Sequence, residues 1–185
     1  MMDMPVAQLD DHDLVARARS GNRSAFATLI DRHYGFVFAV AYRWCANRAD
    51  AEDIAQEVCI KLARALKGFR GEGKFTTWLY RLTLSATHDL ARKRARETRK
   101  AEAYHVHALT EGQTSPDDSE VLDRIWDAAR CLPPKQRDAV LLIYGEGISH
   151  AEAARVMECS ESTVSWHIHE AKKRLKHLIG EDNDG

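Results

Sequence analysis

Apolar residues recur every three or four positions along most of the chain, the period of an α-helix with one buried face. The first such stripe comprises Phe26, Leu29, Ile30, Tyr34, Val37, Phe38, Ala41 and Trp44. The second, in a helix expected to begin with Asp50 as its N-cap, comprises Ile54, Val58, Leu62 and Leu66. The third comprises Trp78, Leu82, Ala86 and Leu90. With no convincing strand pattern and no internal repeat, the sequence predicts an all-α protein.

The C-terminal part carries the start and stop signals of shorter helices. One helix is expected around 121–130, and the Pro-Pro pair in LPPKQRDAVLLIYGEG begins another that the glycines end. Ser149, with Glu152 three residues later, has the sequence of a capping box. A short turn then leads to a final helix capped by Ser160. Two helices joined by such a tight turn predict a helix-turn-helix.

The final helix has an apolar and a polar face when its residues are placed at about 100° intervals. The apolar face comprises Val164, Ile168, Ala171, Leu175 and Leu178. Trp166 projects the other way, so we do not expect it in the core. In a helix-turn-helix the exposed start of the second helix meets base edges in the major groove. The candidate contacts to DNA are Ser160, Ser162, Thr163, Ser165, Trp166 and His169, with Lys172 and Lys173 near phosphates.

Two histidine pairs raise the question of a metal site. His167 and His169 are two positions apart on a helix, so they project about 200° from each other and cannot share an ion. His105 and His107 form an H-x-H that could chelate a metal, but no third ligand is spaced nearby. Solvated loop histidines are therefore the favoured interpretation, and we predict no metal and no cofactor.

Composition and charge narrow the class of protein. The chain has 185 residues, 44% of them hydrophobic, and a formal net charge of −1, so it lacks the basic excess of a domain that grips DNA unaided. Its four cysteines are irregularly spaced, which predicts reduced thiols. No apolar run approaches the roughly 18 residues that span a bilayer, and the acidic N-terminal stretch is unlike a signal peptide. We expect a cytoplasmic protein with no membrane insertion.

The charges are unevenly distributed along the chain. The stretch RKRARETRK is mostly basic, whereas the charged residues from Glu111 to Asp127 are acidic except for Arg124. The segment LTEGQTSPDDSE, where the acidic stretch begins, is polar and has no apolar period, which predicts a flexible linker. We therefore expect two small helical domains, at 11–96 and 120–180, joined by a linker at 97–119.

The order of these features closely resembles that of the bacterial extracytoplasmic-function sigma factors, the small RNA polymerase initiation subunits that keep only sigma regions 2 and 4. The resemblance runs from about Asp11 to Leu178. It rests on DAEDIAQEVCIKLARALKGFRGEGKFTTWLYRLTLSATHDLARKRAR, the acidic linker, and LPPKQRDAVLLIYGEGISHAEAARVMECSESTVSWHIHEAKKRL. It implies a region 2 helical bundle and a region 4 helix-turn-helix. It also implies a subunit that binds core RNA polymerase and directs promoter-specific transcription initiation, in a stress response.

The resemblance also implies a role for each exposed surface of the first domain. The segment DAEDIAQE looks like the part that docks on the clamp helices of the largest polymerase subunit. The implied polymerase contacts are Asp53, Gln56, Glu57 and Lys61, for which a solvated helix face is the alternative. The segment FRGEGKF looks like the loop that captures a flipped base of the melted −10 element. The implied −10 contacts are Phe69, Arg70, Lys74, Phe75, Tyr80, Arg81, Ser85, Arg92 and Arg94.

The chemistry of single-stranded DNA supports this −10 assignment, because unstacked bases are held by aromatic pockets and by basic residues along the backbone. Of the aromatic side chains here, we expect Trp78 in the core and Tyr80 outside it. The second domain looks like the reader of the duplex −35 element. Where the family often has GTVKSRLHRAR this chain has STVSWHIHEAK, so its −35 sequence is expected to be unusual and its phosphate grip weaker. Ser85 likewise stands where the family frequently has Asn.

The family also implies an anti-sigma factor as a partner, and exposed Trp166 would suit a protein as well as DNA. The alternative function is a stand-alone helix-turn-helix regulator that binds duplex operator DNA without polymerase. That alternative leaves FRGEGKF and DAEDIAQE with no task. An enzyme is a more distant alternative, because the sequence has no H-E-x-x-H, no phosphate loop and no nucleophile elbow. We expect a non-catalytic subunit.

Overall fold

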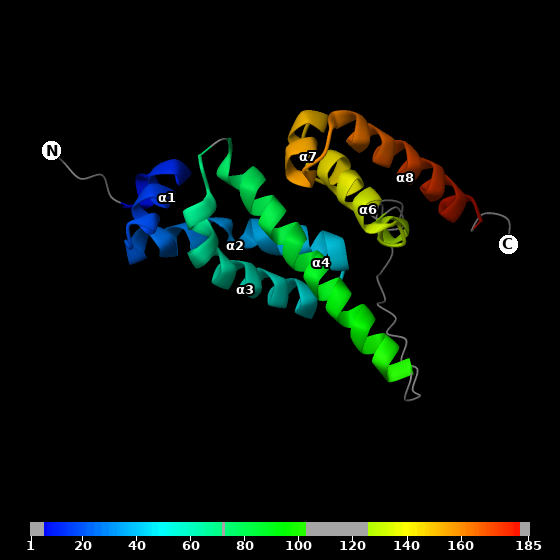
Figure 1. Ribbon diagram of the computed structural model, residues 1–185, viewed down its shortest axis with the longest axis horizontal. Coiled ribbons are helices and arrows are strands. Elements are labelled where there is room, and N and C mark those ends of the chain that lie inside the picture. Colours follow the sequence, from blue (N-terminus) through cyan, green and yellow to red (C-terminus); the bar gives the residue numbers. More distant parts are fainter. Residues whose placement is uncertain (1–5, 72, 103–125, 182–185) are drawn as a thin grey trace, which may run out of the picture. The chain divides into compact units, whose positions relative to one another are not determined.

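The computed structural model describes residues 6–71, 73–102 and 126–181. Every regular element within these residues is helical (Figure 1). The chain divides into two compact units, Met1–Thr87 and His88–Gly185, each of which is described by itself. The prediction of an all-α fold is confirmed for the described part of the chain.

The first unit is built around one long central helix. Its elements are η1 (Val6–Gln8), α1 (Asp11–Arg19), α2 (Arg23–Cys45), α3 (Arg48–Ala65), η2 (Leu66–Gly68) and the first part of α4 (Phe75–Glu102). Both α1 and α3 pack on α2. Leu14, Leu29 and Val58 of these three helices are fully buried, as is Leu79 of α4. Burying each such side chain contributes about 1.5–3 kcal/mol to the stability of this bundle.

Polar side chains fix where the first three helices begin. The side chains of Asp10, Asn22 and Asn47 each accept a hydrogen bond from a backbone N–H three residues on. The prediction that Asp50 is the N-cap of the third helix is wrong, since Asp50 is buried within the first turn and its N–H donates to Asn47. Both residue types cap well, so the sequence alone did not rank the two positions.

The buried face of α4 differs from the predicted one. The buried residues of its first part are Phe75, Leu79, Tyr80, Thr83, Leu84, Ala86 and Thr87. Trp78, Leu82 and Leu90, which were predicted to form the buried stripe, are only half-buried. The hydroxyls of Thr83 and Thr87 donate to backbone carbonyls one turn earlier, at 2.9 and 2.8 Å, and this allows them to be buried. Two polar residues therefore occupy the core side of the helix, which an apolar period cannot reveal.

The second unit contains a helix-turn-helix. Its elements after α4 are the helical residues 126–130, α6 (Pro134–Val140), the π-turn η3 (Leu141–Gly145), α7 (His150–Met157) and α8 (Glu161–Glu181). The capping box of Ser149 and Glu152 is present, and the backbone N–H of Thr163 donates to Ser160 Oγ at 3.1 Å. Both caps are confirmed, and α6 and α7 pack on α8.

The inner face of α8 matches its predicted stripe over the first three turns. Val164, Ile168 and Ala171 are buried, and Leu175 is half-buried. Leu178 was also expected in the core, but it is 37% exposed. The reason is length, because α8 has 21 residues whereas α6 and α7, on which it packs, have 7 and 8.

The predicted linker is only partly within the described residues. Helix α4 continues to Glu102, beyond the position 96 at which the first domain was expected to end. The rest of the predicted linker, including the H-x-H pair of His105 and His107, lies outside the described residues. None of the described helices combines the length and the hydropathy needed to cross a membrane.

Candidate nucleic-acid interface

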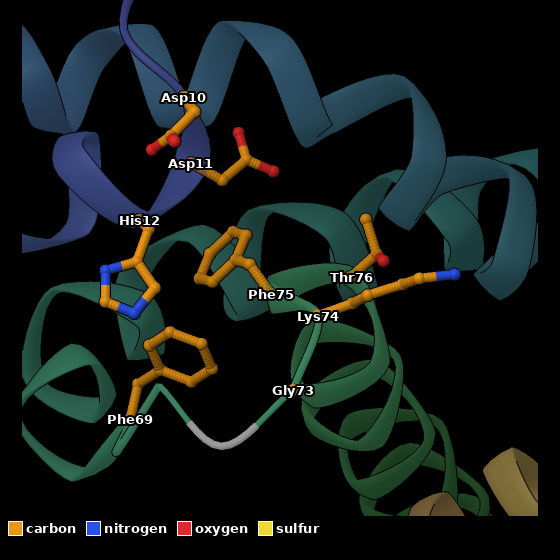
Figure 2. A pocket seen from close by; sticks show the side chains of 8 residues that line it. All are labelled: Asp10, Asp11, His12, Phe69, Gly73, Lys74, Phe75 and Thr76. Carbon is orange, nitrogen blue, oxygen red and sulfur yellow. The ribbon is translucent and has the colours of Figure 1, made fainter.

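A recess of about 360 Å³ opens in the first unit, where the start of α1 meets the segment between η2 and α4 (Figure 2). It is lined by Asp10, Asp11, His12, Phe69, Gly73, Lys74, Phe75 and Thr76. In Figure 2 the rings of His12, Phe69 and Phe75 lie close to one another, and the Lys74 side chain extends away from them. Aromatic walls with polar groups at the rim suit a flat ligand with polar edges, such as a nucleobase.

The aromatic walls belong to a larger cluster of rings. Phe69 and Phe75 meet edge to face at 5.5 Å between ring centroids, and each lies within 5.7 Å of Trp78. His33 of α2 packs edge-on against Phe75 at 5.1 Å. Phe69 and Phe75 are themselves buried. They can therefore offer only part of each ring to a ligand, and the half-buried Trp78 supports them from behind.

Tight backbone turns lead into α4. Gly71 and Gly73 have φ of +77° and +115°, in the region that favours glycine, and the N–H of Gly73 donates to the carbonyl of Gly71 at 3.0 Å. The turn leaves Arg70 and Lys74 exposed on either side of it. Both were predicted to contact the −10 element, and their placement beside the recess is compatible with holding phosphates.

Asp11 joins the recess to α2 through an ion pair with Arg32 and a close polar contact with His33. Its Oδ1 lies 2.8 Å from Nη1 of Arg32, and its Oδ2 lies 2.9 Å from Nε2 of His33. Burial alone would raise the pKa of Asp11, but the hydrogen bonds and charges of His33 and Arg32 outweigh it and lower the pKa below its ordinary value. Asp11 is therefore held as a carboxylate at the edge of the recess.

Tyr80 does not belong to the exposed surface. Only 4% of it is exposed, and its ring meets Phe36 of α2 edge to face at 6.0 Å between centroids. The expectation that Tyr80 lies outside the core is wrong. The cause is the rotation of the buried face of α4 toward Thr83, which carries Tyr80 inward.

Polar and basic side chains form a stripe along α4. Arg81, Ser85, Arg92 and Arg96 are exposed and follow one another at intervals of four, seven and four residues, which keeps them within about 60° on the helix. Arg92 Nη2 pairs with Asp89 Oδ1 at 2.6 Å. Arg94 is exposed as well, but it lies two residues from Arg92 and so about 200° around the helix. Of the predicted contacts on α4, Arg94 is therefore exposed but off this stripe, and Phe75 and Tyr80 are buried.

The predicted reading face of α8 is exposed. Trp166 is 56% exposed, and the other exposed members of the face are Ser162, Ser165, His169, Lys172 and Lys173. The exposed Ser160 caps the helix, since its Oγ accepts the N–H of Thr163 and lies 2.7 Å from the Ser162 hydroxyl and 2.8 Å from the Thr163 hydroxyl. All three hydroxyls are therefore partnered at the start of the helix.

His167 lies at the side of the reading face and is half-buried. Burial, and secondarily the nearby charge of Lys135, lowers its pKa, against an opposing effect of Asp138. Its Nδ1 atom is buried and has no hydrogen-bond partner among the described residues. Across those residues, no group of three or more His, Cys, Asp or Glu side chains is arranged to hold a metal ion.

The predicted polymerase face of α3 is also exposed. Asp53, Gln56 and Glu57 are exposed, and the half-buried Lys61 pairs with Glu57 at 3.2 Å. Ile60 lies on the same face and is 70% exposed, a feature that the sequence analysis missed. The sequence does indicate the exposure of Ile60, because this residue lies four positions after Gln56 and therefore on the charged face of the helix.

Three further residues were missed because their surroundings come from distant parts of the chain. His12 and Arg19 of α1 touch the segment before α4, and Arg19 Nη1 donates to the carbonyl of Phe69 at 3.3 Å. Tyr144, in the π-turn, is exposed and lies beneath Lys172 Nζ, 5.5 Å from the ring centroid. The contact of Tyr144 holds Lys172 at the edge of the reading face.

Two family models match the chain. Sigma-70 region 2 matches residues 29–97, and Sigma-70, region 4 matches residues 122–175. The first match contains the segment before α4 and the whole stripe from Arg81 to Arg96. The second contains the whole of α6 and α7 and the reading face of α8.

Curated relatives align with the chain over nearly its full length. The ECF RNA polymerase sigma-E factor of Haemophilus influenzae is 31% identical over 183 residues, covering 93% of this chain and 96% of its own. The RNA polymerase sigma-H factor of Pseudomonas aeruginosa is 31% identical over 186 residues, covering 94% and 96%. The similarity therefore includes both units and the connection between them.

Two solved structures share the fold. CnrH, in complex with the cytosolic domain of CnrY, is 29% identical, with a TM-score of 0.66 and coverage of 95% of this chain and 99% of its own. The sigma factor RpoE of Bartonella quintana, in complex with the anti-sigma factor NepR, has a TM-score of 0.65 over 84% of this chain and 96% of its own. At 24% identity the second likeness concerns the fold alone.

Proposed function

The chain belongs to the extracytoplasmic-function sigma factors of the sigma-70 family, and we propose that its two units read the two elements of a promoter. As a sigma factor it directs transcription by RNA polymerase. The observation that carries the proposal is the aromatic recess in the region 2 unit, at the segment FRGEGKF. A regulator that only binds duplex DNA has no use for a base-sized recess lined by rings.

In the proposed −10 contact, one unstacked base enters the recess. Unstacking a base costs a few kcal/mol, and contact with aromatic side chains returns about 1–3 kcal/mol per base. Phe69 and Phe75 supply the ring surface, with Arg70 and Lys74 near the adjoining phosphates. The stripe of Arg81, Ser85, Arg92 and Arg96 continues along α4 for the strand that follows. Because Tyr80 is buried, it supports this surface from within and contacts no base.

In the proposed −35 contact, the exposed start of α8 enters the major groove. Trp166 offers an apolar ring edge to a thymine methyl, while Ser162, Ser165 and His169 offer hydrogen bonds to base edges. Lys173 reaches a phosphate from the same face. With a net charge of −1 the chain neutralises few phosphates by itself, so we expect weak binding to duplex DNA until polymerase contributes its own contacts.

The polymerase contact is proposed on the exposed face of α3. Asp53, Gln56 and Glu57 supply charge and hydrogen bonds, and Ile60 supplies an apolar anchor among them. Isolated apolar anchors surrounded by polar groups are typical of the energetic centre of protein interfaces. The subunit would bind core RNA polymerase in the cytoplasm and contribute no catalytic group of its own.

We also propose that a regulatory protein covers these surfaces when the factor is idle. The support is the related structure in which CnrH, 29% identical to this chain, binds the cytosolic domain of CnrY. Exposed Trp166 and Ile60 are large apolar side chains that such a partner would bury. Release of the factor by a stress signal would then start transcription.

Run-off transcription tests the proposed function. Purified core RNA polymerase is supplied with a library of promoter fragments, with and without this chain. Promoter-specific transcripts that depend on the chain are the expected result, and their sequences give both elements. No chain-dependent transcript, together with tight binding of duplex DNA by the chain alone, would instead favour the stand-alone regulator.

A further inference from the structure

Helix α1 lies outside the residues matched by the region 2 family model, which begin at residue 29, yet it forms one wall of the recess. His12, in its first turn, contributes that wall together with Asp10 and Asp11. The His12 ring meets the Phe69 ring edge-on, with 6.5 Å between centroids, as Figure 2 shows. A helix that the family comparison leaves out therefore reaches the site at which a base is proposed to bind.

The His12 ring also occupies the space beside Gly71. A Cβ atom added to Gly71 would lie 2.7 Å from His12 Nε2 and 3.4 Å from His12 Cε1. Such a separation is well inside van der Waals contact, so the glycine permits the imidazole to pack directly on the backbone of the turn. The positive φ of Gly71 independently favours glycine at the same position.

Contacts on both sides of His12 hold α1 in place. The Asp11 carboxylate pairs with Arg32 and His33 of α2. At the other end of α1, Arg19 donates to the backbone carbonyl of Phe69. The imidazole is thus carried by a helix that is anchored both to the bundle and to the segment it touches.

We propose that His12 is a positioning residue for capture of the −10 base, holding Phe69 and the Gly71 turn so that the recess is formed before DNA arrives. The inference rests on the proposed function of that recess. If the recess is already formed, the turn does not have to become ordered when the base binds. The entropic cost of that ordering is then avoided. Helix α1 is therefore part of the promoter-opening machinery, and base capture responds to the side chain at position 12.

The test uses the complete holoenzyme on a promoter recovered by run-off transcription, with 2-aminopurine replacing single bases of its −10 element. The fluorescence of this base analogue changes when it leaves the stack, and this reports base capture. His12→Ala should lower the yield of open complex by about 2- to 10-fold, the effect of losing one aromatic contact. His12→Phe, which keeps a ring on Phe69, should restore most of the yield. Affinity for core polymerase and thermal stability should change little, which separates positioning from a general structural role.

Asp13→Asn is the matched control, since Asp13 is exposed in the same turn and does not line the recess. Gly71→Ala gives a second test that uses the 2.7 Å contact. Gly71→Ala should reduce base capture more in the wild-type protein than in the His12→Ala protein. The added methyl group can displace the imidazole ring only where His12 is present.

An open-complex yield for His12→Ala equal to that of Asp13→Asn would overturn the inference. So would a parallel loss of core-polymerase affinity, or equal effects of Gly71→Ala in the two backgrounds. If the wild-type holoenzyme itself gives chain-dependent transcripts but no fluorescence change at any −10 position, the proposed base capture fails instead. The two failures are therefore distinguishable.

Discussion

Nε2 of His33 lies 2.9 Å from Oδ2 of Asp11, and this contact joins α2 to α1 directly behind the aromatic wall of the recess. The ring of His33 also packs against Phe75 at 5.1 Å. One histidine thus links the anchor of α1 to the residue that begins α4. A change in the ionisation of Asp11 will therefore be felt at the recess.

Asp11→Asn is expected to lower the free energy of unfolding at neutral pH by about 1 kcal/mol or less, since the pair is partly exposed and screened. The pKa of Asp11 is lower in the folded state than in the unfolded chain. Its stabilising effect is therefore complete above the unfolded pKa, near 3.9, and is lost as the pH falls through the folded pKa. Urea unfolding of both proteins across this range measures the difference. A difference that stays constant to the lowest pH would contradict this assignment.

His167 is expected to titrate below the usual value for histidine. Its lowered pKa, caused first by burial, means that the folded state disfavours the proton. Its contribution therefore makes the fold less stable as the pH falls through the unfolded pKa, near 6.5, toward the folded pKa. Following the imidazole NMR signals with pH, assigned by comparison with His167→Gln, gives the pKa directly. A midpoint at or above the ordinary value would contradict the prediction.

Tyr80→Ala is expected to destabilise the first unit by about 3–5 kcal/mol, as large-to-small changes of buried aromatic residues do. Tyr80→Phe should keep most of the stability and of the promoter opening, because it retains the ring that packs on Phe36 in the core. Thermal unfolding and the 2-aminopurine assay measure the two effects. If the Tyr80→Phe protein folds stably but opens the promoter much less than the wild type, Tyr80 contacts DNA after all.

Trp166→Ala is expected to reduce transcription from promoters with the preferred −35 sequence by about tenfold, the value of one good contact to a base edge. Promoters with an altered −35 element should be affected less. Lys173→Ala should weaken binding to all promoters equally. It should also reduce the salt dependence of binding by the amount expected for the loss of about one phosphate contact. Competition between promoter variants in run-off assays distinguishes the two patterns. If Trp166→Ala reduces transcription equally from all promoter variants, the indole does not distinguish −35 sequences.

Ile60→Asp is expected to weaken binding to core RNA polymerase by tenfold or more, as removal of an apolar anchor at the centre of an interface does. Ala27→Asp, which changes another exposed position, on α2, is the control and should have little effect. Fluorescence anisotropy of the labelled chain titrated with core polymerase gives both affinities. If the two variants have equal affinities for core polymerase, the proposed polymerase contact on α3 is wrong.

Much of the fold follows from local signals in the sequence. The first three turns of the inner face of α8, the capping box at Ser149 and the exposure of Trp166 each depend on residues within a few turns of one helix. Such features are fixed by the helical period and by hydrogen bonds to the adjacent backbone. They could be predicted from the sequence, and the structure confirms them.

The residues whose surroundings were not predicted correctly depend on contacts that a local sequence pattern does not show. Thr83 and Thr87 turned the buried face of α4 because their hydroxyls are satisfied by the helix backbone, and this carried Tyr80 inward. The wall formed by His12 requires a contact between residues 12 and 71, which no periodicity in one segment can indicate. The sequence therefore pointed to one side of the recess, the segment FRGEGKF, and gave no sign of the side formed by α1.

The exposed indole of Trp166 gives the proposed −35 contact surface a built-in optical reporter. Trp44 is buried in the first unit, and Trp78 and Trp126 are half-buried, whereas the Trp166 ring is open to solvent. Collisional quenchers such as iodide should therefore reach its emission before that of the other three. Occupation of the reading face by DNA or by a regulatory protein should protect that emission, so engagement can be followed in the unlabelled protein as it happens.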